Sequence, residues 1–174
     1  MTHQEALTLI EKAAPRRGGI WADMGAGSGI FTLALGELVG PEGKVYAVDK
    51  SPEIFQIKPP DAQRFAGIFP VQADFTHPLE IADLDGILMA NALHFVRDPS
   101  SLLRQLAQKI KPGGHLLLVE YDSETANPWV PYPVSRRRFR ELAEAAGLTV
   151  PEEIGRMRSR YHNGDIYVGK AGRK

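Results

Sequence analysis

The chain contains no cysteine. This absence excludes disulfide bonds, thiolate zinc sites and cysteine nucleophiles together, so any chemistry must rely on other side chains. Histidine is also sparse, and four of the five histidines lack the spacing of metal ligands. These four are His3, His77, His115 and His162. We therefore expect no metal site.

Long hydrophobic runs are absent as well. No apolar run approaches the roughly 18 residues that a helix needs to cross a bilayer, and the polar N-terminal segment does not resemble a signal peptide. The 174 residues carry a formal net charge of zero, with 43% hydrophobic and 24% charged side chains. Such a composition is typical of a globular protein, and we expect a single cytoplasmic domain over residues 1–174 with no membrane partner.

The charge is unevenly distributed along the chain. Residues 1–128 hold eleven Lys and Arg against sixteen Asp and Glu, whereas residues 129–174 hold ten against five. The basic end includes Arg136, Arg137, Arg138 and Arg140. A run of this kind can bind nucleic acid, but it continues into an amphipathic helix with Phe139, Leu142 and Ala146 on its inner side. We favour solvated arginines, with a nucleic-acid partner as the alternative.

Apolar periodicity predicts strands that alternate with helices. Strands are expected over 19–24, 45–48, 67–72, 84–90 and 115–119, and helices from Thr2 and over 30–39, 99–110 and 135–147. Prolines break residues 51–65, and residues 111–114 read as a helix stop and a turn. Residues 154–162 and 165–168 predict a hairpin on a two-residue Asn163-Gly164 turn. The pattern indicates an α/β fold with a mostly parallel sheet and an antiparallel edge.

The sequence ADMGAGSG over residues 22–29 carries the most information about a ligand. Gly25, Gly27 and Gly29 remove side chains where a strand turns into a helix, whose first N–H groups are unpaired. The dinucleotide fingerprint fails because Ile30 stands where its third glycine belongs, and no Walker Gly-Lys-Ser/Thr follows. Asp23 would repel a pyrophosphate and attract an ammonium or a hydroxyl. The loop therefore predicts a nucleoside site for a ligand with positive charge.

Two further acidic residues stand at the ends of the next two strands. Asp49 can accept hydrogen bonds from both ribose hydroxyls; alternatively, it caps a helix beginning near Pro52. Asp74 can accept from an exocyclic amine while the Phe75 N–H donates to a ring nitrogen, or it can form an Asx-turn with the residues that follow. Three acids at three successive strand ends favour the nucleoside interpretation.

At these residues the chain resembles the class I S-adenosylmethionine-dependent methyltransferases of the small-molecule type. The resemblance extends from about residue 19 to residue 169. It rests on the glycine loop, VYAVDKSP (45–52), VQADFTHP (71–78), DGILMANALHFVRDP (85–99) and LLRQLAQKIKPGGHLLLVEY (102–121). It implies a Rossmann-like three-layer sandwich with a seven-stranded sheet and a C-terminal antiparallel hairpin.

The resemblance also implies S-adenosyl-L-methionine as the cofactor. Its methionine ammonium would explain an acidic residue beside the glycine loop, and residues 91 and 92 would lie beside the sulfonium. The cofactor-binding residues that it implies are Asp23, Gly25, Ala26, Gly27, Gly29, Asp49, Lys50, Asp74, Phe75, Asn91 and Ala92.

The acceptor is the least determined part of the function. His94 is the best candidate base because an imidazole suits proton transfer near neutral pH; the alternative is a packing histidine. Glu120 is a second candidate base or a structural hydrogen-bonding group. The sulfonium is already activated, so a base is optional and alignment supplies most of the catalysis.

A small-molecule acceptor is the leading interpretation. The alternatives are an RNA or protein acceptor, or a binding protein without transfer activity. The short segments around the site allow either an open site or one covered by a second subunit in a homodimer.

Overall fold

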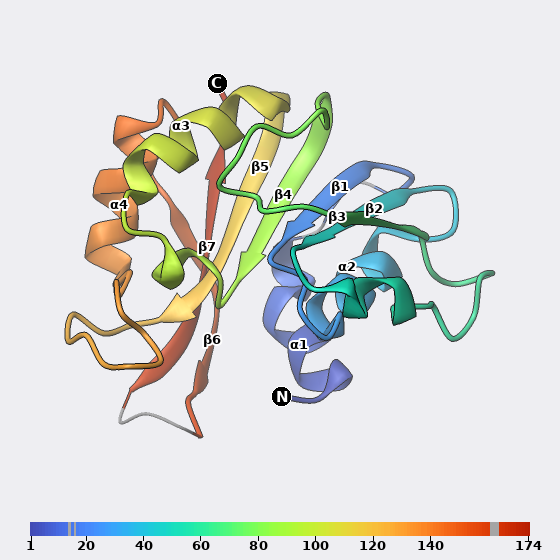
Figure 1. The fold of residues 1–174 in the computed structure, drawn as a ribbon, viewed down its shortest axis with the longest axis horizontal. Coiled ribbons are helices and arrows are strands. Elements are labelled where there is room, and N and C mark those ends of the chain that lie inside the picture. The colour runs from blue at the N-terminus through green and yellow to red at the C-terminus, as the bar shows by residue number, and fades with distance from the viewer. Residues whose placement is uncertain (14, 16, 161–163) are drawn as a thin grey trace.

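A computed structural model describes residues 1–13, 15, 17–160 and 164–174. Its core is one seven-stranded sheet with the strand order β3-β2-β1-β4-β5-β7-β6 (Figure 1). The strands are β1 Ile20–Met24, β2 Lys44–Asp49, β3 Gly67–Gln72, β4 Leu84–Ala90, β5 Ile110–Tyr121, β6 Glu152–Arg158 and β7 Asp165–Gly172. Strands β1 to β5 run parallel, and β7 is antiparallel to both β5 and β6. The mostly parallel sheet with an antiparallel hairpin at its edge is confirmed.

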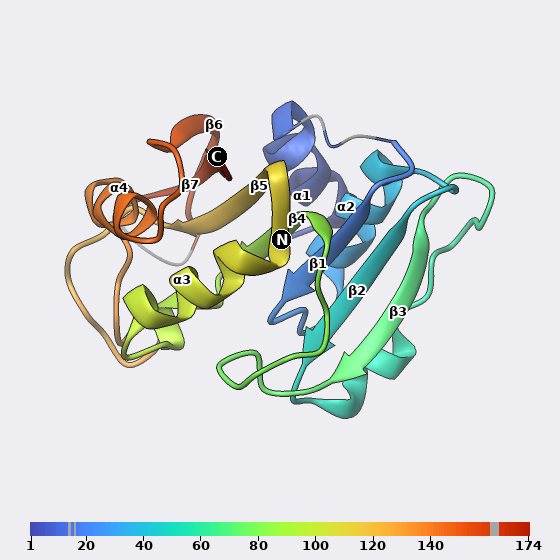
Figure 2. The same cartoon turned by 90° about the horizontal axis from the view of Figure 1, so that it is seen from above.

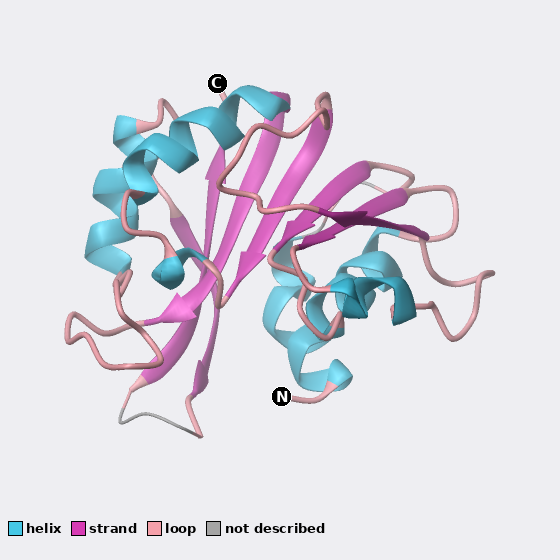
Figure 3. Ribbon diagram, in the orientation of Figure 1, coloured by secondary structure: helices cyan, strands magenta, loops and turns pink. Residues whose placement is uncertain are grey.

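Helices cover both faces of the sheet and complete three layers (Figure 2). α1 (His3–Ile10) and α2 (Ile30–Val39) pack on one face, while α3 (Pro99–Lys109) and α4 (Arg136–Ala145) pack on the other (Figure 3). In the part of the chain that the structure describes, three short 3₁₀ turns lie in the connections: η1 (Glu11–Ala13), η2 (Pro52–Gln56) and η3 (Leu93–Phe95). The central strands are buried by both layers, which explains why their sequences are almost continuously apolar.

The helix ends follow from local sequence. The Thr2 hydroxyl accepts from the Glu5 N–H, and the Glu5 carboxylate accepts from the Thr2 N–H, so the predicted capping box is confirmed. Asp98 caps α3 and Ser135 caps α4 with the same kind of side-chain bond. Each such cap contributes about 1 kcal/mol and fixes where its helix begins.

The prediction of a turn at residues 111–114 is wrong. This segment belongs to β5, whose pairing with β4 shifts between Leu84 and Gly86. The Gly113 N–H donates to the Arg173 carbonyl, and the Arg173 N–H donates to the Gly114 carbonyl, so the chain stays paired. Gly113 has φ +80°, which glycine adopts at low cost. The Pro-Gly-Gly sequence therefore bends the strand instead of ending it.

The predicted hairpin is present, but its register differs from the prediction. A two-residue turn at Asn163-Gly164 would pair residue 162 with Asp165, whereas the structure pairs Arg158 with Asp165. Residues 161–163, which include Asn163 of the predicted turn, lie outside the described residues. Met157 and Ile166 pair with each other and pack on the α1 side of the sheet. Burial of this apolar face, rather than the turn sequence, sets the register.

No helix in the described part of the chain is long and apolar enough to span a bilayer.

Candidate cofactor site

Two adjoining cavities lie at the carboxyl ends of the parallel strands. The first cavity, of about 520 Å³, is lined by residues that follow β1, β2, β3 and β4. The second cavity, of about 280 Å³, lies between the glycine loop, the start of α2 and the end of β4. Gly25, Gly27 and Asn91 line both cavities. This edge is where open α/β sheets bind their ligands, beside the point at which the strand order reverses.

The glycine loop brings two of its three glycines to the cavities. Gly25 has φ +84°, and a Cβ there would lie 2.7 Å from the Ala92 Cβ. Gly27 has φ +50°, and a Cβ there would meet nothing within 4 Å, so its backbone is open to a ligand. Gly29 lines neither cavity; it is the N-cap of α2 and packs against Ile57. The structure thus gives Gly29 a packing role.

Asp23 is buried at the second cavity with one carboxylate oxygen lacking a partner. Its Oδ2 accepts a 2.6 Å hydrogen bond from the Thr32 hydroxyl, whereas Oδ1 has none among the described residues. Burial raises the pKa of Asp23 to about 7; the Thr32 bond opposes this shift, and the Asp49 carboxylate adds to it. A cation in the cavity would supply the missing partner and stabilise the ionised form.

Asn91, which also lines the second cavity, supplies a second unpartnered oxygen among the described residues. Its side-chain Oδ1 is buried without a hydrogen bond within the described residues. Its φ of +51° is a left-handed conformation that asparagine tolerates better than most residues. The Asp23 and Asn91 oxygens therefore offer two acceptors at one cavity. An ammonium, with three donors and no acceptor, matches that pair.

Asp49 connects β2 to the glycine loop. Its Oδ2 accepts from the Gly27 N–H and its Oδ1 from the Ser51 N–H, both at 2.9 Å. The 3₁₀ turn η2 is capped by Ser51 instead, so the helix-cap alternative for Asp49 does not apply. A carboxylate has about four lone-pair sites, and two of them stay available to ligand hydroxyls at the first cavity.

Asp74 forms the predicted turn, and its role toward adenine stays a prediction. Its Oδ1 accepts from the Thr76 N–H at 2.9 Å and from the Thr76 hydroxyl at 2.6 Å, which is the expected turn. These bonds lower the pKa of Asp74, so its charged form is favoured. Asp74 nevertheless lines the first cavity together with Lys50 and Phe75. Ala26 lies at the second cavity, so every predicted cofactor residue except Gly29 reaches one of the two cavities.

His94 and Glu120 form a buried pair that lines neither of the two cavities. His94 Nδ1 lies 2.7 Å from Glu120 Oε2, and the His94 N–H donates to Glu120 Oε1 at 3.2 Å. Their exposed fractions are 2% and 0%, and neither side chain lines the first or second cavity. The pair anchors η3, whose Phe95 does line the first cavity. The geometry places Glu120 as a partner of His94, and their roles as bases stay predictions.

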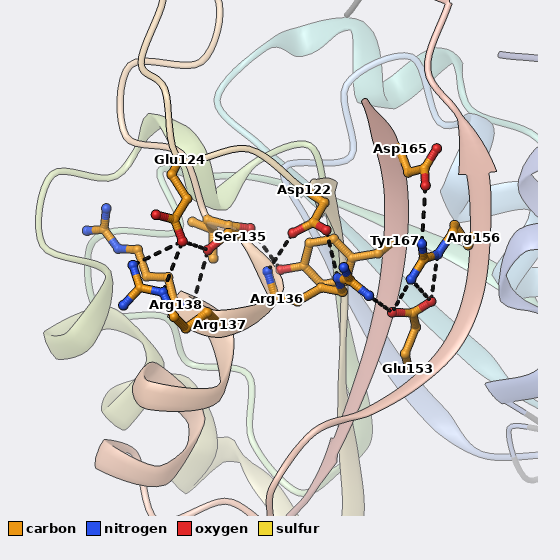
Figure 4. Close-up of polar contacts among 11 residues, drawn as sticks. Asp122, Glu124, Ser135, Arg136, Arg137, Arg138, Glu153, Arg156, Asp165 and Tyr167 are labelled. Carbon is orange, nitrogen blue, oxygen red and sulfur yellow. Dashed lines mark hydrogen bonds and ion pairs between the residues drawn. The ribbon is translucent and has the colours of Figure 1, made fainter. Parts of the chain in front are cut away.

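The arginine run forms ion pairs on the surface of α4 (Figure 4). Arg136 pairs with Asp122 at 2.7 Å and with Glu153 at 2.9 Å. Arg137 pairs with Glu124 and Glu141, and Arg138 donates to the Pro133 carbonyl. On the opposite side of the helix Phe139 and Leu142 are buried and Ala146 is half-buried, as predicted.

Sequence reasoning missed Thr32. It is buried in α2, on the inner side of the largely apolar sequence IFTLALGELV, and its hydroxyl is the single protein partner of the Asp23 carboxylate among the described residues. A lone polar residue on the inner side of an apolar helix, one turn after the glycine loop, is the feature that could have indicated it. Phe95 and Val96 of the first cavity were also not predicted.

Comparison with known proteins identifies the family. A family model described as a methyltransferase domain matches residues 2–153. The chain belongs to the class I S-adenosylmethionine-dependent methyltransferases. The cofactor of this family is S-adenosylmethionine, and the unpartnered Asp23 and Asn91 oxygens beside an open glycine loop fit its ammonium. The Rossmann-like fold and the cofactor that the motifs implied are thereby confirmed.

Two curated relatives illustrate the range of the family. A protein-L-isoaspartate O-methyltransferase of Methanopyrus kandleri is 31% identical over 165 residues, covering 92% of this chain and 62% of the relative. A ubiquinone/menaquinone biosynthesis C-methyltransferase of Hahella chejuensis is 32% identical over 125 residues, covering 70% of this chain and 50% of the relative. The chain thus spans about half to three-fifths of the length of these relatives.

Solved structures agree in fold. The 1,6-didemethyltoxoflavin-N1-methyltransferase of Burkholderia thailandensis, a complex with S-adenosylhomocysteine, has a TM-score of 0.72 at 21% identity. The match covers 99% of this chain and 78% of that one. The N-methyltransferase NodS of Bradyrhizobium japonicum has a TM-score of 0.69 at 18% identity, covering 99% and 94%.

Proposed function

We propose that this chain, as one domain over residues 1–174, transfers a methyl group from S-adenosylmethionine to a small-molecule acceptor. The observation that carries the proposal is the pair of buried, unpartnered oxygens on Asp23 and Asn91 beside the glycine loop. Buried polar groups are rarely left unsatisfied, because each costs about 1–3 kcal/mol. A ligand ammonium at this point would remove that cost.

In this proposal the first cavity binds the nucleoside part of the cofactor, and the second cavity binds its methionine part. In this arrangement Asp49 accepts from the ribose hydroxyls, while Asp74 and the Phe75 backbone bind the adenine, with Lys50 at the rim of the first cavity. The second cavity takes the methionine part, which contacts Ala26 and the backbone at Gly25 and Gly27. Asn91, which lines both cavities, and Ala92, which lines the first, would lie beside the sulfonium.

The reaction requires little from the protein beyond alignment. The bound cofactor supplies a methyl on a sulfonium: the acceptor–methyl bond forms, the sulfur–methyl bond breaks, and its electron pair stays on sulfur. The chain's residues hold the two reactants in line and exclude water, which can contribute up to about 7–11 kcal/mol. His94, held by Glu120, either removes the acceptor's proton or fixes η3; without a base, the proton leaves to water.

The relatives' names favour one alternative. The Methanopyrus relative is called a protein O-methyltransferase, so methylation of a protein carboxylate is the second candidate function. Nucleic acid is less favoured, because Arg136 and Arg137 are already ion-paired.

A homodimer that covers the site and a cytoplasmic location belong to the same proposal. Phe95 at the rim of the first cavity is 60% exposed and would be covered by the second subunit.

A screen of methyl acceptors tests the proposed function. The full chain is incubated with S-adenosylmethionine and panels of small phenols, amines and carboxylates, with isoaspartyl peptides and RNA as parallel arms, while release of S-adenosylhomocysteine is measured. We expect turnover with a small molecule. Turnover confined to the peptide or RNA arm would establish the macromolecular alternative, and binding without turnover in any arm would favour the binding-only protein.

Replacement of Asp49 by alanine should weaken binding of S-adenosylhomocysteine by more than tenfold. The variant loses the ribose acceptor and also the bonds that tie Gly27 and Ser51 to β2; charge-assisted bonds of this kind are worth roughly 1.5–3 kcal/mol. Calorimetry on the variant measures the effect. The matched control is Asp61→Ala, which removes an exposed carboxylate that accepts one backbone N–H and should not alter affinity. Equal affinity of Asp49→Ala and wild type would refute the ribose role.

A further inference from the structure

A third cavity adjoins the second one at the ends of β4 and β5. Its volume is about 200 Å³, and Asn91, Tyr121, Met157, Arg158, Arg160 and Ile166 are among its lining residues. Among the described residues, Asn91 alone lines all three cavities. It therefore lies between the proposed nucleoside and methionine sites on one side and this third cavity on the other. A molecule in the third cavity would approach the cofactor at its sulfonium.

The floor of the third cavity is apolar because of strand register. Tyr121 at the end of β5 pairs with Ile166 of β7, and Ile166 pairs with Met157 of β6. Paired residues in neighbouring strands point to the same face, and all three pack with the residues on the α1 side of the sheet. These three side chains, from β5, β7 and β6, form an apolar surface against which the body of an acceptor can pack.

The rim of the third cavity carries an excess of positive charge. Arg158 is exposed and makes no hydrogen bond or ion pair with the described residues, whereas Arg156 on the same strand is held by Glu153 and Asp165. Arg160 pairs with Glu5, which is the one carboxylate among the described residues that line the cavity. Among the described residues, the Arg158 guanidinium therefore has no counter-charge.

We infer that the third cavity binds the methyl acceptor and that the acceptor is a small organic acid with an apolar body. This inference rests on the proposed function. The anionic group lies at Arg158, with Arg160 beside it, and the apolar body covers Tyr121, Met157 and Ile166. The reacting atom points to Asn91. The volume is below the roughly 300–1,000 Å³ of pockets for drug-sized ligands, so the acceptor is about the size of a simple aromatic or short aliphatic acid.

Calorimetry with paired acids and amides tests the inference. The full chain is saturated with S-adenosylhomocysteine, and benzoate and hexanoate are compared with their neutral counterparts benzamide and hexanamide. We expect each acid to bind at least tenfold more tightly than its amide, because a charge-assisted bond to a guanidinium is stronger than a neutral one. In the Arg158→Gln/Arg160→Gln variant this preference should be lost. The matched control, Arg104→Gln, removes an exposed charge on α3 and should keep the preference.

The outcomes separate the inference from the proposed function. If S-adenosylhomocysteine binds but acids and amides bind equally, or if no acid binds, the inference is wrong and the cofactor site stands. The same conclusion follows if the arginine double variant retains the preference for acids while its melting temperature matches that of wild type. A single charge reversal, Arg158→Glu, gives a second check, because it should abolish acid binding without reducing affinity for S-adenosylhomocysteine. Failure of S-adenosylhomocysteine to bind at all would instead contradict the proposed function.

Discussion

Replacement of Asp23 by asparagine is expected to weaken S-adenosylmethionine binding by about 100-fold or more while making the free protein more stable at pH 8. The buried carboxylate has one oxygen bonded to Thr32 and one without a partner. In the complex the unpartnered oxygen would face an ammonium, and breaking a buried charge pair typically costs about 3–5 kcal/mol. Without the cofactor, however, the same carboxylate is an uncompensated buried charge.

The stability gain of Asp23→Asn depends on pH in a defined direction. The folded-state pKa of Asp23 is raised by burial from 3.8 to about 7, so between these values the folded chain holds a proton that the unfolded chain has released. The free energy of unfolding therefore falls as pH rises through this window, and the full cost of the ionised Asp23 carboxylate is present above pH 7. At about 1.4 kcal/mol per pH unit, the cost reaches up to about 4 kcal/mol. Asparagine does not titrate, so the variant lacks this decline.

Two measurements check this prediction. Urea unfolding of the free protein should show a large gain for Asp23→Asn at pH 8 and almost none at pH 4, whereas calorimetry at pH 8 should show the loss of cofactor affinity. Asp61→Asn, an exposed change of the same chemistry, should alter neither quantity. Unchanged cofactor affinity, or a variant less stable than wild type at pH 8, would contradict the role assigned to Asp23.

The second large effect concerns the pair of His94 and Glu120. Glu120→Ala should lower the free energy of unfolding by about 3–5 kcal/mol, because it removes the partner of both the His94 ring and its backbone N–H in a fully buried site. Glu120→Gln keeps a hydrogen-bond acceptor for the ring and should cost less. Urea unfolding of the two variants and of His94→Ala, combined in a double-mutant cycle, measures the coupling. A loss below 1 kcal/mol for Glu120→Ala would contradict the pairing.

Turnover of His94→Gln separates the two roles left open for this histidine. If His94 is the base, kcat should fall while the affinity for S-adenosylhomocysteine and the KM of the acceptor stay near their wild-type values. If the pair only fixes η3, the cofactor affinity should fall as well, because Phe95 and Val96 after it line the first cavity. This test uses whichever acceptor the screen identifies.

Much of the fold could be predicted because its features are local. The helix over residues 30–39 lies between a glycine turn and Gly40-Pro41, and the structure gives the same bounds. Strands at 67–72 and 84–90 are likewise reproduced, since short apolar runs bounded by turn residues define them. The bend at Gly113 was not predictable, because it depends on hydrogen bonds with Arg173, 60 residues along the chain.

The candidate site could also be predicted from the sequence only in part. The cofactor residues follow strands that end at one edge, so their positions in the sequence place them together. The partner of His94 and the residues that form the third cavity cannot be predicted so simply. Glu120 and Tyr121 are neighbours in sequence, yet strand alternation gives them different surroundings. The Glu120 carboxylate bonds the His94 ring, whereas Tyr121 lines the third cavity, with its ring centroid 6.0 Å from that of His94. That cavity joins Asn91, which follows β4, with residues from β5, β6 and β7, and its existence depends on the register of the hairpin.

A crystal structure of the full chain with S-adenosylhomocysteine is the most direct test of this account. We expect the ligand ammonium within about 3.2 Å of Asp23 Oδ1 and Asn91 Oδ1, the ribose hydroxyls at Asp49, and the sulfur beside Asn91 where the third cavity opens. A ligand whose ammonium contacts neither oxygen, or whose ribose lies away from Asp49, would contradict it.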